Sequence, residues 1–340
     1  MKCRSTAPKV LMAAMLTCLV AGEASAQAVE VYGLIGVFAG SVQRSGEREG
    51  TKQLGAGGLT TSYLGFRGEE DLGNGLKMIF SLESFFRPDT GEQGRTPADP
   101  LFSRNAWVGV DSAYGRVTLG RQTNPTYAVM SQLSPFGSSV VFSPLAVQSF
   151  VAAYGSNIIG DTVWNNTVQY STPELKGLRG SVLYGTGEVP GHTGQANLGV
   201  HGTYRDGPFM AALSMQRVRI NVNRPLPEAQ DSWLAGANYD FGPLKLYGSA
   251  AGTRIDSGAD TRLYDAGLSV PVSAAGTLLL EGARSRIDLP NGVEKHRTTT
   301  SFGYDHRLSK RTDVYAVYSY DKKTDASSGN TVAFGIRHAF

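Results

Sequence analysis

Apolar and polar residues alternate with a period of two along most of the chain, and this alternation predicts β-strands. In residues 64–67, leucine and phenylalanine alternate with glycine and arginine. Residues 77–83 continue the pattern imperfectly, and residues 313–320 carry aromatic side chains near both ends. Because successive side chains of a strand point to opposite faces, each segment would have one apolar face and one polar or small face.

The alternating segments are separated by breaks of two sizes. The short breaks are rich in Gly, Asn, Asp and Pro, which favour turns. Seven short breaks lie at 71–75, 112–115, 173–177, 206–208, 240–243, 273–276 and 308–311. Eight longer polar breaks lie near 43–58, 87–100, 124–162, 186–195, 220–231, 257–261, 288–297 and 322–330. Together they delimit sixteen strand-like segments.

An even number of strands, joined alternately by short turns and long loops, is typical of outer-membrane β-barrels. Closure into a barrel also pairs the strand edges that an open sheet would expose. No stretch after Gln27 has 18 consecutive apolar residues, which excludes membrane-spanning helices. We therefore predict an all-β fold, a sixteen-stranded antiparallel transmembrane β-barrel.

The N-terminal segment has the order of a secretory signal peptide. Three basic residues precede an apolar stretch at 10–21, and a small-x-small cleavage site follows at 24–26. We predict a cleaved signal peptide over residues 1–26 and one barrel domain over residues 27–340. Both cysteines lie in the removed segment, so the mature chain would have no disulfide and no cysteine-bound metal.

Composition and charge narrow the function classes. The chain has 42 Gly, 15 Tyr and 14 Phe but only 18% charged residues, which favours a turn-rich β protein. The signal peptide carries three of the 32 basic and one of the 29 acidic residues, so the mature net charge is +1. A near-neutral chain has no field that would hold nucleic acid by its phosphates. No nucleotide or metal motif is present, and we expect no cofactor.

The last strand-like segment, residues 331–340, alternates and ends in Phe340. A terminal aromatic residue on such a strand resembles the signal that the barrel-assembly machinery of the outer membrane recognises. The alternative is an ordinary buried final strand. Combined with the signal peptide and the sixteen segments, the ending favours the assembly signal.

Several segments carry a family resemblance, in order, through essentially the whole mature chain. They are Tyr32-Gly33, 64–73, 104–109, 119–122, 166–170, 308–312 and 335–340. They resemble the Gram-negative general porins, most closely the β-proteobacterial branch (Neisseria, Bordetella, Burkholderia and Comamonas). The resemblance implies a homotrimer embedded in outer-membrane lipid and lipopolysaccharide. It also implies passive diffusion of small hydrophilic solutes and ions through each barrel.

The longest break, residues 124–162, is expected to fold into the barrel and narrow it, as the third loop does in such porins. Pro135, Phe136 and Gly137 resemble the tip of that loop, the alternative being an ordinary exposed turn. Residues 122–160 contain no Asp, Glu, Lys or Arg, whereas the family usually sets acids there opposite wall arginines. The transverse field should therefore be weak on the loop side.

Strand parity predicts which wall residues face the lumen, since an Arg or Lys on the lipid face near mid-bilayer costs about 2–4 kcal/mol. For the strand near residue 104, parity places Ala106 and Val108 inward with Arg104, and Trp107 outward. Glu69 and Ser81 are also expected to point inward. The predicted pore-lining and constriction residues are Tyr63, Arg67, Lys77, Glu83, Arg104, Pro135, Phe136 and Gly137, the alternative for Arg67 being a structural role nearer the periplasmic rim.

The ion preference follows from the charges that line the pore. Arg67, Lys77 and Arg104 face an uncharged loop and favour anions, while Glu69 and Glu83 oppose them. We predict a weak anion preference, because family positions that usually hold further arginines hold other residues here. The alternative is a solute-specific channel with a narrowed, uncharged constriction.

Arg121 has the outward parity of Val117 and Leu119. Related porins use a basic residue near this position at the trimer contact, where the second loop of a neighbour reaches over. We treat Arg121 as a candidate trimer contact; the alternative is an arginine that extends to the membrane interface.

An enzymatic barrel is the main competing class. The chain has no G-x-S-x-G motif to accompany a catalytic histidine. Its five histidines are His192, His201, His296, His306 and His338. The sequence therefore predicts no enzyme. A surface adhesin is also disfavoured, because the loops other than the third are modest in length.

Overall fold

The computed structural model describes residues 29–340 apart from 155–158, 160, 189, 191–193, 195, 221–227, 257 and 259. The predicted signal peptide, residues 1–26, and the domain boundary that follows it lie outside the described residues. No helix in the described part of the chain is long and apolar enough to cross a membrane.

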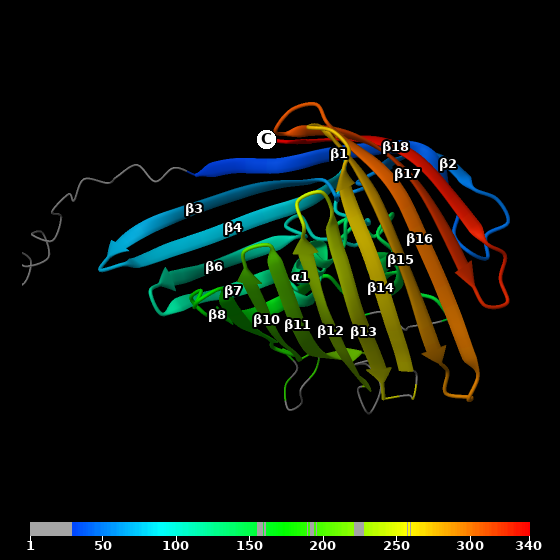
Figure 1. Cartoon of the computed structure of the whole chain (residues 1–340). Coiled ribbons are helices and arrows are strands. Elements are labelled where there is room, and N and C mark those ends of the chain that lie inside the picture. Colours follow the sequence, from blue (N-terminus) through cyan, green and yellow to red (C-terminus); the bar gives the residue numbers. More distant parts are fainter. Residues whose placement is uncertain are drawn as a thin grey trace, which may run out of the picture.

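The described chain forms a closed antiparallel β-barrel (Figure 1). The strands are β1 (Glu30–Val42), β2 (Thr51–Ala56), β3 (Tyr63–Gly73), β4 (Leu76–Arg87), β5 (Glu92–Gln93), β6 (Asn105–Ser112), β7 (Gly115–Thr123), β8 (Val163–Ser171), β9 (Leu178–Gly185), β10 (Asn197–Asp206), β11 (Phe209–Ile220), β12 (Glu228–Asp240), β13 (Lys245–Ile255), β14 (Asp260–Pro271), β15 (Gly276–Asp288), β16 (Glu294–Arg307), β17 (Thr312–Lys323) and β18 (Gly329–Ala339). Strand β1 pairs with β18 and closes the barrel.

In the described part of the chain, the eighteen strands occupy sixteen positions in the barrel wall, as the sequence predicted. Strand β5 is a two-residue pairing with the end of β4 in the second loop. Strands β2 and β3 form two halves of one wall position, because both pair with β1, β2 with its second half and β3 with its first. All seven predicted short breaks join consecutive wall strands. Long connections alternate with them, so the predicted sixteen-stranded barrel is confirmed.

The predicted long break at 43–58 is wrong in its second half, where β2 lies. The interruption between β2 and β3 contains Gly57 and Gly58, whose φ angles of 83° and 86° favour glycine. The hydroxyl of Ser62 spans the gap, since it accepts from the Gly36 amide (2.9 Å) and donates to the Gly36 carbonyl (3.0 Å). A six-residue strand bounded by glycines gives too short an alternation to stand out in the sequence.

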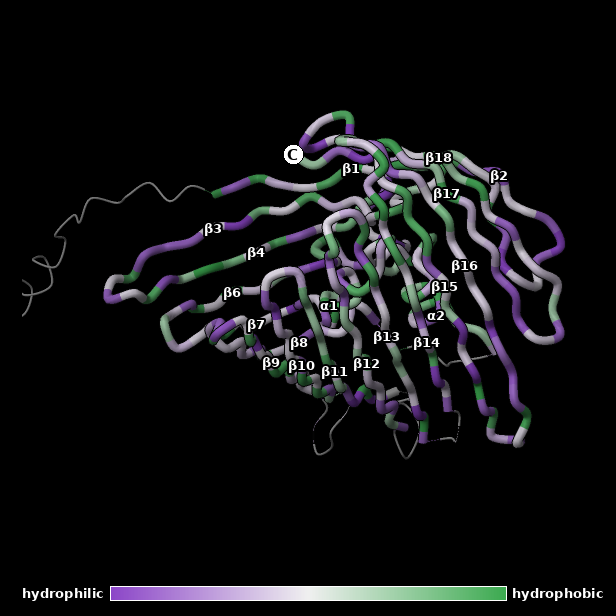
Figure 2. The backbone as a smooth tube through the Cα atoms, in the orientation of Figure 1, coloured by the Kyte–Doolittle hydropathy of each residue, from purple (hydrophilic) through white to green (hydrophobic). Residues whose placement is uncertain are grey.

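Hydrophilic residues gather toward the ends of the strands, while hydrophobic residues recur along their length (Figure 2). Large apolar side chains on the outer face are left exposed, for example Leu119 (50%), Met215 (56%) and Phe334 (63%). An exposed apolar band around a closed barrel is the surface that lipid covers in an outer membrane.

The third loop carries two helices, α1 (Pro125–Leu133) and α2 (Pro144–Phe150). Each helix begins at a proline preceded by a side chain that caps its free amides, Asn124 for α1 and Ser143 for α2. Helix α1 contacts β10–β13, and helix α2 contacts β14–β16. Both helices lie inside the ring of strands (Figure 2).

Apolar packing holds the loop against this wall. Met130, Leu133 and Leu145 from the loop and Leu234 from β12 are all 0% exposed and belong to one cluster. A second cluster joins Phe136 and Phe142 of the loop to residues of β1, β15, β17 and β18. Burying each such side chain is worth about 1.5–3 kcal/mol, so the loop is a packed element of the barrel interior.

Three wall glycines make room for the loop, and we call Gly236, Gly267 and Gly303 the glycine sockets. A methyl group added at any of them would approach a loop side chain to 2.8 Å, which requires something to move. The loop side chains that occupy the sockets are, in order, Leu133, Pro135 and Phe136.

Candidate pore constriction

A cavity of about 820 Å³ lies inside the barrel between the third loop and the wall formed by β1, β3, β4, β6 and β7. Its lining is polar and aromatic. The wall contributes Tyr32, Arg67, Ser81, Glu83, Arg104, Asn105 and Trp107, and the loop contributes Tyr127, Ala128, Ser131 and Ser138. A cavity of this size, lined by polar groups, has room for water and small hydrophilic solutes.

The central ion pair of the cavity joins Arg104 to Glu83, with 2.5 Å between Nη1 and Oε2. The guanidinium also lies over the ring of Tyr63, 4.2 Å from its centroid. The Glu83 side chain is only 5% exposed, whereas that of Arg104 is 30% exposed. Glu83 accepts further hydrogen bonds from the Tyr32 hydroxyl (2.5 Å) and from the Asn105 amide. A solute in the cavity therefore meets the cation of this pair rather than the carboxylate.

A second pair, Arg67 with Glu30, is open to water on both sides. Arg67 donates from Nε and Nη2 to the two carboxylate oxygens of Glu30, each at 2.7 Å, and stacks over the ring of Tyr32 at 4.5 Å. The two side chains are 54% and 55% exposed. An exposed pair of this kind has little net field at a distance.

Lys77 and Glu69 form a similar exposed pair, with 2.8 Å between Nζ and Oε1. They lie next to the short turn that joins β3 to β4. Lys77 is therefore placed at the rim and does not line the constriction cavity.

The parity predicted for β6 is wrong. Trp107 lies opposite Ser81 and lines the lumen cavity, whereas Val108 is 41% exposed on the outer face, together with Ala106. The reason is that the strand begins one residue after Arg104. Arg104 reaches the lumen from the bend that precedes the strand, so it does not share the strand's alternation.

The turn at the tip of the third loop is closed by a hydrogen bond from the Gly137 amide to the Ser134 carbonyl, at 3.1 Å. Gly137 has a φ of 62°, a conformation that favours glycine. Phe136 is 2% exposed and Pro135 fills a glycine socket, so these two side chains fasten the tip to the wall. The turn as a whole borders a second lumen cavity of about 460 Å³.

Arg337 is the main cation of this second cavity, and we did not single it out from the sequence. It donates to Asp313 (2.7 Å) and to Thr60 (3.0 Å), and it lies 3.4 Å from Asp305. On β18, residue 337 has the opposite parity to the exposed Phe334, so the alternation of this strand could have identified Arg337 as a residue of the lumen.

Glu281 on β15 holds the uncharged loop by hydrogen bonds. Its carboxylate accepts from the hydroxyls of Ser134 (2.6 Å) and Ser143 (3.1 Å) and from the backbone amide of Leu145 (3.1 Å), and the residue is 0% exposed. Hydrogen bonds to a charged acceptor are stronger than neutral ones. The acid that anchors the loop is thus on the wall, and the loop supplies the donors.

We expect Glu281→Gln to loosen the third loop. The neutral amide oxygen would accept more weakly than a carboxylate from the Leu145 amide, and the amide nitrogen would force a serine hydroxyl to turn from donor to acceptor. The expected loss is about 1–3 kcal/mol. Single-channel recordings should show more frequent brief closures and a broader open-state current than wild type. Glu174→Gln, on an exposed turn residue, is the matched control. An unchanged current trace in Glu281→Gln would show that these hydrogen bonds do not restrain the loop.

Arg121 lies at the outer end of β7 beside an irregularity in the pairing with β8. It donates to the Ser103 carbonyl at 2.9 Å and to the side chain of Asn165. Asp99, one of the acids expected to meet an arginine here, is held by Arg95 of its own loop at 2.8 Å. Hydrogen bonding from Arg95 holds the pKa of the Asp99 carboxyl below its ordinary value. The role of Arg121 at a trimer contact stays a prediction.

The C-terminal residue closes the barrel. The amide of Phe340 donates to the Gly33 carbonyl (3.1 Å), and the Gly33 amide donates to the Phe340 carbonyl (3.2 Å). The ring of Phe340 covers Gly33, where a methyl group would approach it to 2.6 Å. The last residue is therefore tied to the first strand by backbone and side chain together.

In a comparison with known families, the family model described as Gram-negative porin matches residues 11–326 of this chain. The chain belongs to the Gram-negative porin family. This porin is 29% identical to outer membrane porin protein 32 of Delftia acidovorans, over 98% of this chain and 100% of the relative. It is 28% identical to an outer membrane porin protein of Bordetella pertussis, over 98% of this chain and all of that relative.

Among solved structures, the porin is similar to the anion-selective porin from Comamonas acidovorans, with a TM-score of 0.79 and 28% identity. The match covers 92% of this chain and 100% of that one. Relatives in Neisseria place the chain in the β-proteobacterial branch that the sequence resembles. The protein is an outer-membrane porin, and its barrel is a passive channel for small hydrophilic solutes.

Proposed function

We propose that this porin has a weak preference for anions, set mainly by Arg104. The observation that carries the proposal is the unequal exposure of the central ion pair, 30% for Arg104 and 5% for Glu83. The loop that faces the pair has no charged residue to oppose the guanidinium. The similar porin of Comamonas acidovorans is described as anion-selective, which agrees with the direction.

The preference should be weak because three other cations on the lumen side of the wall are paired with carboxylates. Arg67, Lys77 and Arg337 each have a carboxylate within 2.8 Å. Pairs exposed to water contribute little field beyond about 8–10 Å at physiological salt. Among the residues that line the constriction cavity, Arg104 is the cation whose carboxylate partner is shielded from the lumen.

We further propose that the channel works as a homotrimer, with Arg121 at the contact between subunits. The proposed partners are the surrounding outer-membrane lipid and lipopolysaccharide, and the barrel-assembly machinery acting on the strand that ends in Phe340. No enzymatic activity is part of the proposal, since the matching family is described as Gram-negative porin and the similar Comamonas acidovorans protein as an anion-selective porin.

The test is single-channel conductance and reversal potential in planar bilayers across a tenfold gradient of potassium chloride. We expect conductance in groups of three equal steps and a chloride-to-potassium permeability ratio slightly above one. A clear cation preference would refute the proposed role of Arg104, and single rather than triple steps would refute the trimer.

A solute-specific channel is the second candidate, and one observation favours it. Tyr32, Tyr63, Trp107 and Tyr127 surround the arginines of the constriction. Such a surface suits a small organic carboxylate that stacks as well as pairs. In liposome-swelling assays, a specific channel would admit a preferred carboxylate faster than a neutral sugar of the same mass, with saturation. A general porin would show neither.

A further inference from the structure

A small cavity lies inside the barrel behind the third loop, between helix α2 and the inner faces of β13 and β14. Helix α2 contributes Gln148 and Ser149 to its lining, and the two strands contribute Thr253 and Thr261. The cavity has a volume of about 10 Å³, which is close to the minimum that one water molecule requires. It is separate from the constriction cavity, with which it shares no lining residue.

Each of these four side chains carries an oxygen atom that is buried without a hydrogen-bond partner. The atoms are Gln148 Oε1, Ser149 Oγ, Thr253 Oγ1 and Thr261 Oγ1, and no donor or acceptor reaches them within the part of the chain that the structure describes. The four residues are only 3–7% exposed. Buried polar atoms are almost always hydrogen-bonded to the protein or to an ordered water molecule. Four such atoms around one cavity therefore indicate a shared partner.

The orientation of the Gln148 amide is set by its nitrogen. Nε2 donates to the Ala283 carbonyl of β15 (2.9 Å) and to the Thr299 hydroxyl of β16 (3.0 Å). The amide oxygen is consequently the end of this group that has no partner, and it can only accept a hydrogen bond. A molecule that fills the cavity must therefore be able to donate.

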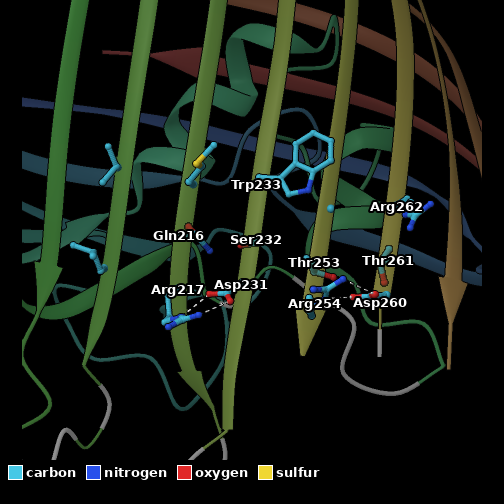
Figure 3. A pocket seen from close by; sticks show the side chains of 14 residues that line it. Gln216, Arg217, Asp231, Ser232, Trp233, Thr253, Arg254, Asp260, Thr261 and Arg262 are labelled. Atoms are coloured by element: carbon cyan, nitrogen blue, oxygen red, sulfur yellow. Dashed lines mark hydrogen bonds and ion pairs between the residues drawn. The ribbon is translucent and has the colours of Figure 1, made fainter. Parts of the chain in front are cut away.

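The strand register brings the two threonines together. Thr253 of β13 lies directly opposite Thr261 of β14, and both are buried on the inner face, whereas the residues that follow them, Arg254 and Arg262, are exposed on the outer face. Figure 3 shows the two threonines on neighbouring strands at the same level. Side chains directly opposite in antiparallel strands are about 4.5–5.5 Å apart at Cβ. Two hydroxyls at this spacing can hold one small molecule between them.

The hydrogen-bonding capacity of the four atoms matches one water molecule. Three are hydroxyl oxygens, which donate or accept, and the fourth only accepts. A water molecule donates two hydrogen bonds and accepts two, so it can reach all four. A bound cation fits less well, because it would leave the hydroxyl protons without an acceptor. In addition, no acidic side chain among the described lining residues would balance its charge.

We propose that this cavity binds a single ordered water molecule that joins helix α2 to the barrel wall. The water donates to Gln148 Oε1 and connects it to the hydroxyls of Thr253 and Thr261. Glu281 holds the start of α2 through the Leu145 amide, and the water holds its last turn. The inference does not depend on the ion preference of the porin or on its oligomeric state.

The primary test is a crystal structure of the refolded full-length mature porin that shows ordered water. We expect one peak of electron density within hydrogen-bond distance of Gln148 Oε1 and of at least two of the three hydroxyls. The absence of a peak, with the four side chains bonded to one another instead, would overturn the proposal.

Soaking the crystals in rubidium chloride separates a water molecule from a monovalent cation. Rubidium gives an anomalous signal and water does not, so we expect no anomalous peak in this cavity. An anomalous peak, or density closer to its ligands than a hydrogen bond allows, would show that the ligand is a metal ion and would overturn the proposal.

Thr253→Val/Thr261→Val keeps the shape of both side chains and removes two of the hydroxyls. We expect the density peak to be lost, and brief closures of the single channel to become at least about twofold more frequent, because α2 is held less firmly. Thr298→Val/Thr300→Val is the matched control. These two threonines alternate with the buried Arg297 and Thr299 on β16 and so face away from the loop.

The control should keep both the density peak and the wild-type current trace. A peak that persists in Thr253→Val/Thr261→Val would show that the two hydroxyls do not hold the water. A variant that loses the peak but keeps the wild-type frequency of closures would refute the role of the water in positioning α2.

Discussion

Replacing Arg104 with glutamine is expected to reverse the ion selectivity of this porin, from a weak preference for anions to a preference for cations. The change leaves the Glu83 carboxylate without its cation while Tyr32 and Asn105 still hold it in place. A unit charge about 4 Å away contributes about 1 kcal/mol even in water. We therefore expect the chloride-to-potassium permeability ratio to fall at least about fivefold.

Reversal potentials in a potassium chloride gradient measure this ratio directly. Glu83→Gln/Arg104→Gln removes both charges and should return the ratio close to one. Arg311→Gln, on the short turn between β16 and β17, removes a cation away from the constriction and should leave the ratio unchanged. If Arg104→Gln keeps the wild-type preference, the ion preference is set elsewhere in the lumen.

Filling the glycine sockets is expected to narrow the pore. In Gly267→Val/Gly303→Val the new side chains would occupy space now held by Pro135 and Phe136, with approaches of 2.8 Å already at Cβ. Overpacking of this kind costs about 1–3 kcal/mol per site, and the loop tip can relieve it by moving toward the lumen. We expect the single-channel conductance to fall by about half or more. A loop tip that moves into the lumen by the width of a methyl group reduces the open cross-section of the pore.

Gly248→Val is the matched control, because this glycine lies in the same wall with no atom within 4 Å of the added Cβ position. Its conductance should equal that of wild type. Wild-type conductance in the double variant would mean that the tip does not rest in the sockets. A larger conductance would contradict the displacement toward the lumen and would mean that the loop leaves the wall.

The barrel itself was predictable from the sequence because the features that specify its strands and turns are local. Alternation and turn residues mark each strand and each break without reference to any other segment, and sixteen strands followed from them. The two errors arose where local alternation fails. Strand β2 is cut short by Gly57 and Gly58, and Arg104 precedes the strand whose parity was applied to it.

The contacts of the third loop were not predictable, because they depend on which residues of distant strands meet it. Residues 122–160 revealed an uncharged loop, but not that Glu281 anchors it from β15. Nor could a sequence rich in glycine show that Gly236, Gly267 and Gly303 form sockets. These features require the barrel register, which no single segment contains.

The two faces of helix α1 have different roles, since one packs against the barrel wall and the other borders the pore. Met130 and Leu133 secure the helix to the wall, while Ala128 and Ser131 border the passage without holding the helix in place. Mutations at the second pair can therefore alter the filter without endangering the scaffold. Substitutions at Ala128 or Ser131 can therefore change the permeability of the pore one residue at a time during evolution. The same two positions are suitable sites for engineering the selectivity of the channel.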